Sequence, residues 1–261
     1  GSSMPQKRPE RRPDKRSDKP RRVPERHRQG RDPRGAPPRH RPRETDAIER
    51  PRADLSKEIR QELMATARPG KGDILVKVFS EAAAAFMNGD YQETIRLGEQ
   101  AKHIALRSIA ARELLGLAYY RAGRWQEAAK ELAAFKRLSG STEQNPVLAD
   151  SYRAMGKPDK ALEYCREIDR KSVDEAVYYE GAIVGAGALA DMDRLDEAIA
   201  LLERLNLRPE VAGEHHLRVW YVLADLLERK GRYTQARELF ESVAAADADL
   251  TDAPERAARL N

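Results

Sequence analysis

The sequence is poor in cysteine and contains no long apolar run. Its one cysteine, Cys165, excludes an intramolecular disulfide and a zinc site built from cysteines. No segment approaches the roughly 18 consecutive apolar residues that span a membrane, and no apolar stretch follows the charged N-terminus as in a secretory signal. We therefore expect a cytoplasmic protein without a membrane partner. The excess of Arg over Lys, 35 to 13, together with abundant Ala, favours a bacterial source.

Aromatic residues are missing from the first 50 residues, which instead hold nine of the 15 prolines. This segment contains 17 Lys or Arg and 8 Asp or Glu, a net charge of +9, whereas the remaining 211 residues carry −4. A segment with so few apolar side chains buries too little surface to offset the entropy lost on ordering. The sequence therefore predicts a disordered, basic, Pro/Arg-rich tail over residues 1–50.

Short arginine clusters concentrate the positive charge of this tail. They contain Arg11, Arg12, Arg21, Arg22, Arg26, Arg28, Arg39, Arg41 and Arg43. Such clusters attract polyanions through phosphate contacts and counterion release, without reading a base sequence. Acidic residues are interspersed among them and weaken this attraction. Two interpretations stay open: a solubilising linker, or an arm that tethers the chain to RNA, the ribosome or DNA.

Tight turns recur along the remainder of the chain at a nearly constant interval. They begin at Gly89, Gly123, Gly156, Asp193 and Gly231, which are 34, 33, 37 and 38 residues apart. A period of this length is typical of stacked helical repeats, and glycine suits a turn position with positive φ. The two longer intervals predict a lengthened helix or linker around the fourth repeat.

Small residues keep the same register relative to every turn. Seven residues before the turn stand Ala82, Gly116, Ala149, Ala186 and Ala224, and five after it stand Thr94, Ala128, Ala161, Ala198 and Ala236. Small side chains at fixed positions indicate two antiparallel helices that cross closely. One such pair does not bury its apolar face alone, so the pairs must stack.

With these residues in place, the chain resembles the tetratricopeptide repeat (TPR) family. The strongest matches are Leu115-Gly116 with Tyr119, Trp125 and Ala128, and Trp220 with Ala224, Tyr233, Ala236 and Phe240. The resemblance implies an all-α, right-handed superhelical solenoid of about five helix-turn-helix repeats over residues 73–246. Residues 51–72 are expected to form a capping helix, begun by Asp54 or Ser56, and a linker. Residues 247–261 are expected to form a C-terminal capping segment.

Several motifs that suggest chemistry are explained better by structure. The glycines between Val184 and Ala190 lie inside a predicted helix and not after a strand, so helix packing explains them better than dinucleotide binding. The neighbours His215 and His216 point about 100° apart on a helix, unlike an i, i+4 zinc pair, and are expected to be solvated. Cys165 occupies a core register and is expected to be inert. We therefore predict no enzyme activity, no catalytic residue, and no cofactor or metal site.

The resemblance also implies where a partner binds. In TPR-like stacks the first helix of each pair lines a concave groove, and the repeat register assigns that groove to specific positions. These are Phe79, Ala83, Phe86, Glu113, Leu117, Tyr120, Arg121, Asp150, Arg153, Glu180, Ile183, Asp191, Arg218, Tyr221, Asp225 and Arg229. At its N-terminal end, either Phe79 and Phe86 receive an apolar anchor, or the helix over residues 54–66 covers them.

Two functions remain open at this point. The first is an adaptor that binds a protein or peptide segment in the groove while the tail adds attachment to a polyanion. The alternative is an RNA- or ribosome-associated factor in which the tail provides most of the binding. The sequence does not specify an oligomeric state.

Overall fold

The computed structural model describes residues 49–260, which belong to one compact unit. Residues 1–48 of the tail predicted over residues 1–50, with all nine arginines assigned to polyanion binding, lie outside the described residues. Within 49–260 every regular element is a helix and there is no strand. None of the helices in this range is long and apolar enough to cross a membrane.

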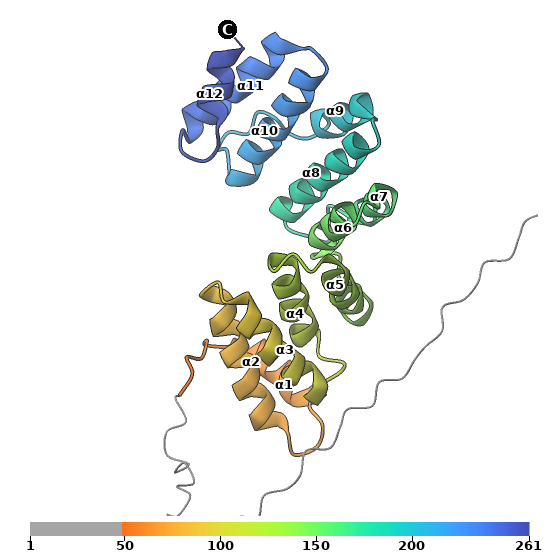
Figure 1. Cartoon of the computed structure of the whole chain (residues 1–261), viewed down its shortest axis with the longest axis vertical. Helices are drawn as coiled ribbons and strands as arrows, with labels where there is room; N and C mark the ends of the chain where they lie inside the picture. The colour runs from red at the N-terminus through yellow and green to blue at the C-terminus, as the bar shows by residue number, and fades with distance from the viewer. Residues whose placement is uncertain (1–48, 261) are drawn as a thin grey trace, which may run out of the picture. The chain divides into compact units, whose positions relative to one another are not determined.

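Twelve helices follow one another through the described residues (Figure 1). Their bounds are α1 Lys57–Thr66, α2 Gly72–Met87, α3 Tyr91–Ile104, α4 Ile109–Arg121, α5 Trp125–Ser139, α6 Asn145–Ala154, α7 Pro158–Arg166, α8 Glu175–Asp191, α9 Leu195–Glu203, α10 Glu214–Arg229, α11 Tyr233–Ala246 and α12 Ala253–Arg259. Helices α2 to α11 form five consecutive pairs, stacked in chain order. The predicted all-α solenoid of five pairs is therefore confirmed, and the lengthened fourth repeat corresponds to the 17-residue helix α8 and the linker after α9.

The turn within each pair has one geometry. Its first residue has a positive φ in all five pairs, between 73° and 78° at the four glycines and 60° at Asp193. The amide of the next residue donates to the carbonyl five positions earlier, as in Arg124 to Tyr119 and Arg194 to Leu189, both 2.9 Å. This bond closes the helix end by the usual left-handed cap. The fourth turn adopts the same backbone geometry without glycine, because aspartate tolerates the left-handed region better than most residues do.

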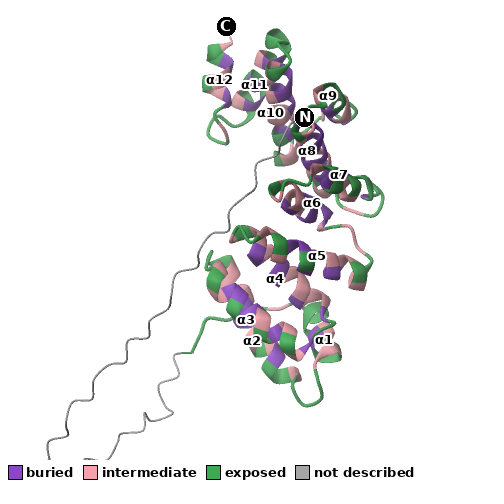
Figure 2. Cartoon of the chain, turned by 45° about the vertical axis from the view of Figure 1, so that its right-hand side comes forward, coloured by how far each residue is buried: buried purple, intermediate pink, exposed green. Residues whose placement is uncertain are grey.

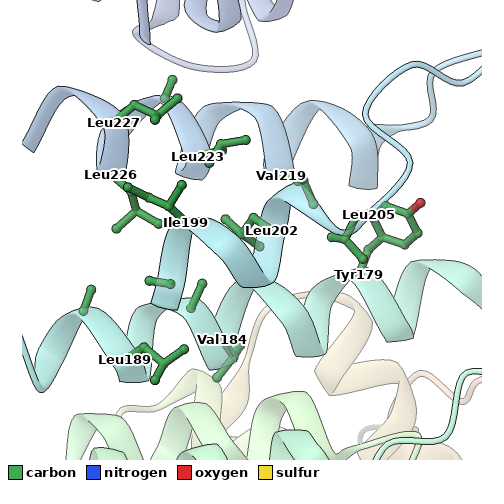
Figure 3. Close-up of a cluster of buried hydrophobic side chains, with 14 of the residues drawn as sticks. Tyr179, Val184, Leu189, Ile199, Leu202, Leu205, Val219, Leu223, Leu226 and Leu227 are labelled. Carbon is green, nitrogen blue, oxygen red and sulfur yellow. The ribbon is translucent and has the colours of Figure 1, made fainter. Parts of the chain in front are cut away.

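The small residues of the repeat register lie in the core. Ala82, Ala149, Ala186 and Ala224 are fully buried, as are Thr94 and the four alanines of the second register. At Gly116 a β-carbon would lie 2.6 Å from a methyl of Leu132, so only glycine allows α4 and α5 to approach this closely. Figure 2 shows buried residues along the helices where successive pairs meet. Figure 3 shows one such cluster, in which Leu189, Ile199 and Leu223 come from α8, α9 and α10.

Helix α1 closes the N-terminal end of the stack. The Ser56 hydroxyl accepts from the Ile59 amide at 3.2 Å, which confirms the predicted cap. Leu63 is fully buried in one cluster with Leu75 and Phe79. Glu62 accepts from the Ser108 hydroxyl at 2.8 Å and from the Ile109 amide at 2.6 Å, and so binds the first residues of α4. Two features therefore hold α1 on the stack: the apolar packing of Leu63 and the hydrogen bonds that Glu62 accepts at the start of α4.

Helix α12 covers the C-terminal end of the stack. Ala253 and Ala257 are buried against the preceding pair. The Arg256 guanidinium donates to Asp225 at 2.9 Å and to Glu228, both in α10, and lies 4.5 Å from the centre of the Phe240 ring of α11. Helix α12 thus covers the last pair of helices, and its Arg256 forms ion pairs with carboxylates of that pair.

Candidate protein-interaction face

The predicted groove positions all come from the first helices of the five pairs, α2, α4, α6, α8 and α10. Most of them lie half-exposed on what we call the first-helix face, defined by Phe86, Glu113, Tyr120, Arg121, Asp150, Arg153, Glu180, Asp191, Arg218, Tyr221, Asp225 and Arg229. Phe79 differs, because it is 5% exposed and packs in the cluster of Leu63. Of the two alternatives for the N-terminal end, cover by α1 therefore holds for Phe79.

Phe86 lies in an aromatic patch away from that cover. Its ring meets the Tyr91 ring edge-on, with centroids 5.5 Å apart. The Arg121 guanidinium lies 6.0 Å from the Phe86 centroid and 5.7 Å from that of Tyr91, and it donates to the Tyr91 hydroxyl at 3.1 Å. These contacts hold α2, α3 and α4 together at the surface and present ring edges beside a cation.

The next junction, between α4 and α6, is made by two polar contacts. The Tyr120 hydroxyl donates to Asp150 at 2.5 Å, and the Gln144 side chain donates to Glu113 at 3.2 Å. Burial, followed by the bond to Asp150, raises the pKa of Tyr120, so this phenol stays protonated and remains a donor. Burial also raises the pKa of Glu113. The charged form of this carboxylate is therefore less stable in the fold than in water.

Arg153 joins α6 to α8. Its guanidinium makes two bonds to Asp191, of 2.8 and 3.3 Å, and a third of 3.2 Å to Asp150. Burial opposes the charge on Arg153, yet the two aspartates raise its pKa. A β-carbon at Gly187 would lie 2.5 Å from this guanidinium. The glycine-rich part of α8 thus serves close packing, as the sequence predicts, and here the group packed on it is an arginine.

Glu180 and Arg218 join α8 to α10 in the same manner. Two N–O contacts of 2.7 and 2.9 Å make this a bidentate pair, the strongest geometry for an arginine and a carboxylate. Burial nevertheless raises the pKa of Glu180 more than Arg218 lowers it. Beyond it, Tyr221 donates to Asp252 at 2.7 Å, and Arg256 of α12 bonds Asp225.

We call these contacts the ladder, because side chains of one first helix contact side chains of the first helix in the next pair. Its members are half-exposed, so their hydrogen bonds are partly open to solvent and exchangeable. The repeat register identified most of the ladder but not Tyr91, Gln144 and Arg256. Tyr91 begins the second helix α3, and Arg256 belongs to a capping helix that has no repeat register from which to assign it.

The described residues also contain a cleft on a different part of the stack. It has a volume of about 400 Å³ and lies between α7, α8 and α9, with Cys165, Tyr178 and Leu201 in its walls. Burial raises the pKa of the Cys165 thiol to about 12, so the thiol is protonated and a poor nucleophile. The expectation of an inert cysteine agrees with this, although Cys165 is only half-buried.

The expected solvation of the histidine pair is incorrect. His216 is 5% exposed, and its Nδ1 accepts from the Gly213 amide at 3.0 Å. The two imidazole rings do not diverge, because their centroids are 4.1 Å apart. The 100° rule for adjacent helical residues describes the Cβ directions and leaves out rotation about the side-chain bonds.

A tetratricopeptide repeat family model matches residues 189–259, from the end of α8 through α12. No curated protein matches the sequence. Solved structures resemble it in fold. The nearly identical TPR-like repeats assigned to a kinesin light chain of Podosopora anserina align with a TM-score of 0.56 at 23% identity, covering 69% of this chain and 98% of that one. A thermophilic TPR protein of Thermus thermophilus aligns with a TM-score of 0.54 at 18% identity, covering 71% of this chain and 98% of that one.

Proposed function

Because this chain is a TPR-like helical-repeat protein, we propose that it is a protein-interaction scaffold whose first-helix face binds a segment of a partner protein. The ladder of half-exposed pairs along that face is the observation that carries this proposal. It places hydrogen-bond donors and acceptors at each junction, from Arg121 to Arg218. An extended or helical segment that crosses several repeats meets one such junction after another.

The chemistry of the face indicates the kind of segment that binds. Aromatic edges at Phe86 and Tyr91 beside Arg121 suit an apolar or aromatic side chain as anchor. The pairs Arg153–Asp191 and Glu180–Arg218 suit a polar stretch that exchanges hydrogen bonds with them. We therefore infer a mostly polar partner segment with one apolar anchor.

We further infer that this is a binding protein of the bacterial cytoplasm and not an enzyme. Phenols held protonated and carboxylates paired with arginines stabilise an interface, and none of them is a free base or nucleophile on this face. The basic tail is proposed to add attachment to a polyanion. The alternative, in which the tail provides most of the binding to RNA or the ribosome, requires that the first-helix face be dispensable.

Matched substitutions test the proposal on the full-length chain. Arg218→Gln removes a ladder cation that is 49% exposed. Arg194→Gln removes a cation that is 40% exposed, precedes the second helix α9 and pairs with Glu197 of that helix. Proteins captured from a bacterial lysate by wild type and by each variant are compared by quantitative mass spectrometry. We expect a defined partner to be lost by Arg218→Gln and retained by Arg194→Gln. Equal capture by both variants would contradict the proposed face.

A further inference from the structure

Three side chains with metal-binding atoms converge where α8 and α10 begin. Glu175 is the first residue of α8, and His215 and His216 are the second and third residues of α10. Their ligand atoms all lie within 4.8 Å of one another. Across residues 49–260, no other set of three or more His, Cys, Asp or Glu side chains converges in this way.

Gly213 explains how two neighbouring histidines come together. It precedes α10 with an extended backbone, φ −84° and ψ 170°. A β-carbon at this position would lie 2.8 Å from Cε1 of His215 and 3.0 Å from its Nδ1. The absence of a side chain thus lets the His215 ring fold back over the start of the helix. The ring then lies beside that of His216, with 38° between their planes.

One polar atom in this cluster is buried without a hydrogen-bond partner among the described residues. It is Nε2 of His215, whose ring centroid lies 5.0 Å from that of Tyr179. The nearest carboxylate oxygen to Nε2 belongs to Glu175 and is 3.7 Å away, which is too far for a hydrogen bond. A buried nitrogen left unpaired destabilises the fold, because it has lost its hydrogen bonds to water. An ion between the imidazoles and the carboxylate would supply the missing partner.

His216 is already held by one hydrogen bond. Its Nδ1 now accepts from the Gly213 amide. Coordination through either nitrogen breaks this bond: a metal on Nδ1 displaces the Gly213 amide, and a metal on Nε2 moves the ring proton to Nδ1, which then faces the amide N–H.

We propose that Glu175, His215 and His216 form a binding site for a divalent transition-metal ion of the zinc type. Imidazole nitrogens with one carboxylate oxygen are a usual zinc donor set, with bonds of about 2.0–2.2 Å. Tetrahedral bonds of that length place ligand atoms about 3.3 Å apart. The three groups therefore have to draw together, and the half-exposed Glu175 has to turn inward from its exposed ion pair with Arg170, whose N–O distance is 3.7 Å.

A metal at this point ties the fourth pair of helices to the fifth. Glu180 and Arg218, which join α8 and α10 on the first-helix face, follow the ligands by five and three residues. The ion would hold the same two helices at their N-terminal ends. The site stands independently of the proposed partner binding, because its residues and contacts are separate from the ladder.

Zinc titration of the full-length protein tests the site. We expect one Zn²⁺ ion to bind in calorimetry and to raise the melting temperature, and Co²⁺ to give the visible absorption of a tetrahedral site. His215→Gln should weaken Zn²⁺ binding by about 100-fold or more, and Glu175→Gln by at least about tenfold. His103→Gln, which removes an exposed histidine of α3, should leave binding unchanged.

A double His27→Gln/His40→Gln variant separates this site from the histidines of the N-terminal segment. It should bind Zn²⁺ as wild type does. Circular dichroism of each variant establishes that it is folded, and Glu175→Gln is an exposed change that does not touch the core. Binding that survives both His215→Gln and Glu175→Gln, or that is lost only in the double variant, would overturn the proposal.

Discussion

At the scale of single residues, the fourth turn shows how much backbone conformation matters. Asp193 has φ of 60°, in the left-handed region where the other four turns have glycine. For a residue with a β-carbon, this conformation is about 1–2 kcal/mol less stable than the right-handed one. The greater freedom of glycine in the unfolded chain offsets part of this difference.

We therefore expect Asp193→Gly to stabilise the protein by about 0.5–1 kcal/mol. The converse change, Gly156→Ala, should destabilise it by about 1 kcal/mol or more, because Gly156 has φ of 73°. Urea unfolding followed by circular dichroism measures both. A loss of stability in Asp193→Gly would show that the aspartate side chain contributes more than its backbone strain costs.

The second prediction at this scale concerns Glu113 and pH. Burial raises the pKa of Glu113, so the folded state binds its proton more readily than the unfolded state does. The stabilising contribution of protonated Glu113 is therefore present below the unfolded-state pKa of about 4.3. It is lost as the pH rises through the pKa of Glu113 in the folded state. Glu113→Gln should then be more stable than wild type at pH 7, with the difference disappearing near pH 4.

The exposed Glu163→Gln is the control for this measurement, because it changes the same group outside the ladder. Unfolding free energies of wild type and both variants at several pH values give the comparison. If Glu113→Gln were less stable than wild type at pH 7, the hydrogen bond from Gln144 would outweigh the cost of burying the charge.

At the scale of elements, the sequence pattern predicted the helices but not every contact between them. The turn interval and the small residues located all five pairs, because these features repeat and a repeat determines register. The ends of the chain are different. The burial of Phe79 by Leu63 depends on where α1 packs, and nothing periodic in residues 54–66 specifies that.

Helix α1 should stabilise the whole stack through that contact. Leu63 is fully buried, whereas its neighbour Met64 is 49% exposed. Leu63→Ala should lower the free energy of unfolding by about 2–5 kcal/mol, and Met64→Ala by about 0.5 kcal/mol at most. Denaturant unfolding measures both changes. Equal effects of the two substitutions would mean that α1 is only loosely attached.

At the scale of the whole molecule, the ladder gives the stack a continuous set of junctions. Each pair bonds the next through side chains of the first helices, from the Tyr120–Asp150 bond to the Glu180–Arg218 pair. The sequence located this face through the family register. It did not predict that the charges pair with one another, because the partners lie 30–38 residues apart and only the folded stack brings them together.

The large separation of contacting residues in the sequence also explains why the histidine cluster was not predicted. Glu175 is 40 residues before His215, and the ring positions depend on the missing side chain at Gly213. A pattern search finds metal sites whose ligands are close in sequence. Here the ligands belong to successive pairs of the stack.

The central claim, that the first-helix face and not the basic tail holds a protein partner, is tested most directly by removing the tail. Full-length protein and residues 49–261 are compared in lysate capture, each with and without nuclease, and read by mass spectrometry. We predict that a defined protein partner remains after both treatments. Recovery of mainly ribosomal or nucleoprotein material that disappears with either treatment would contradict the claim.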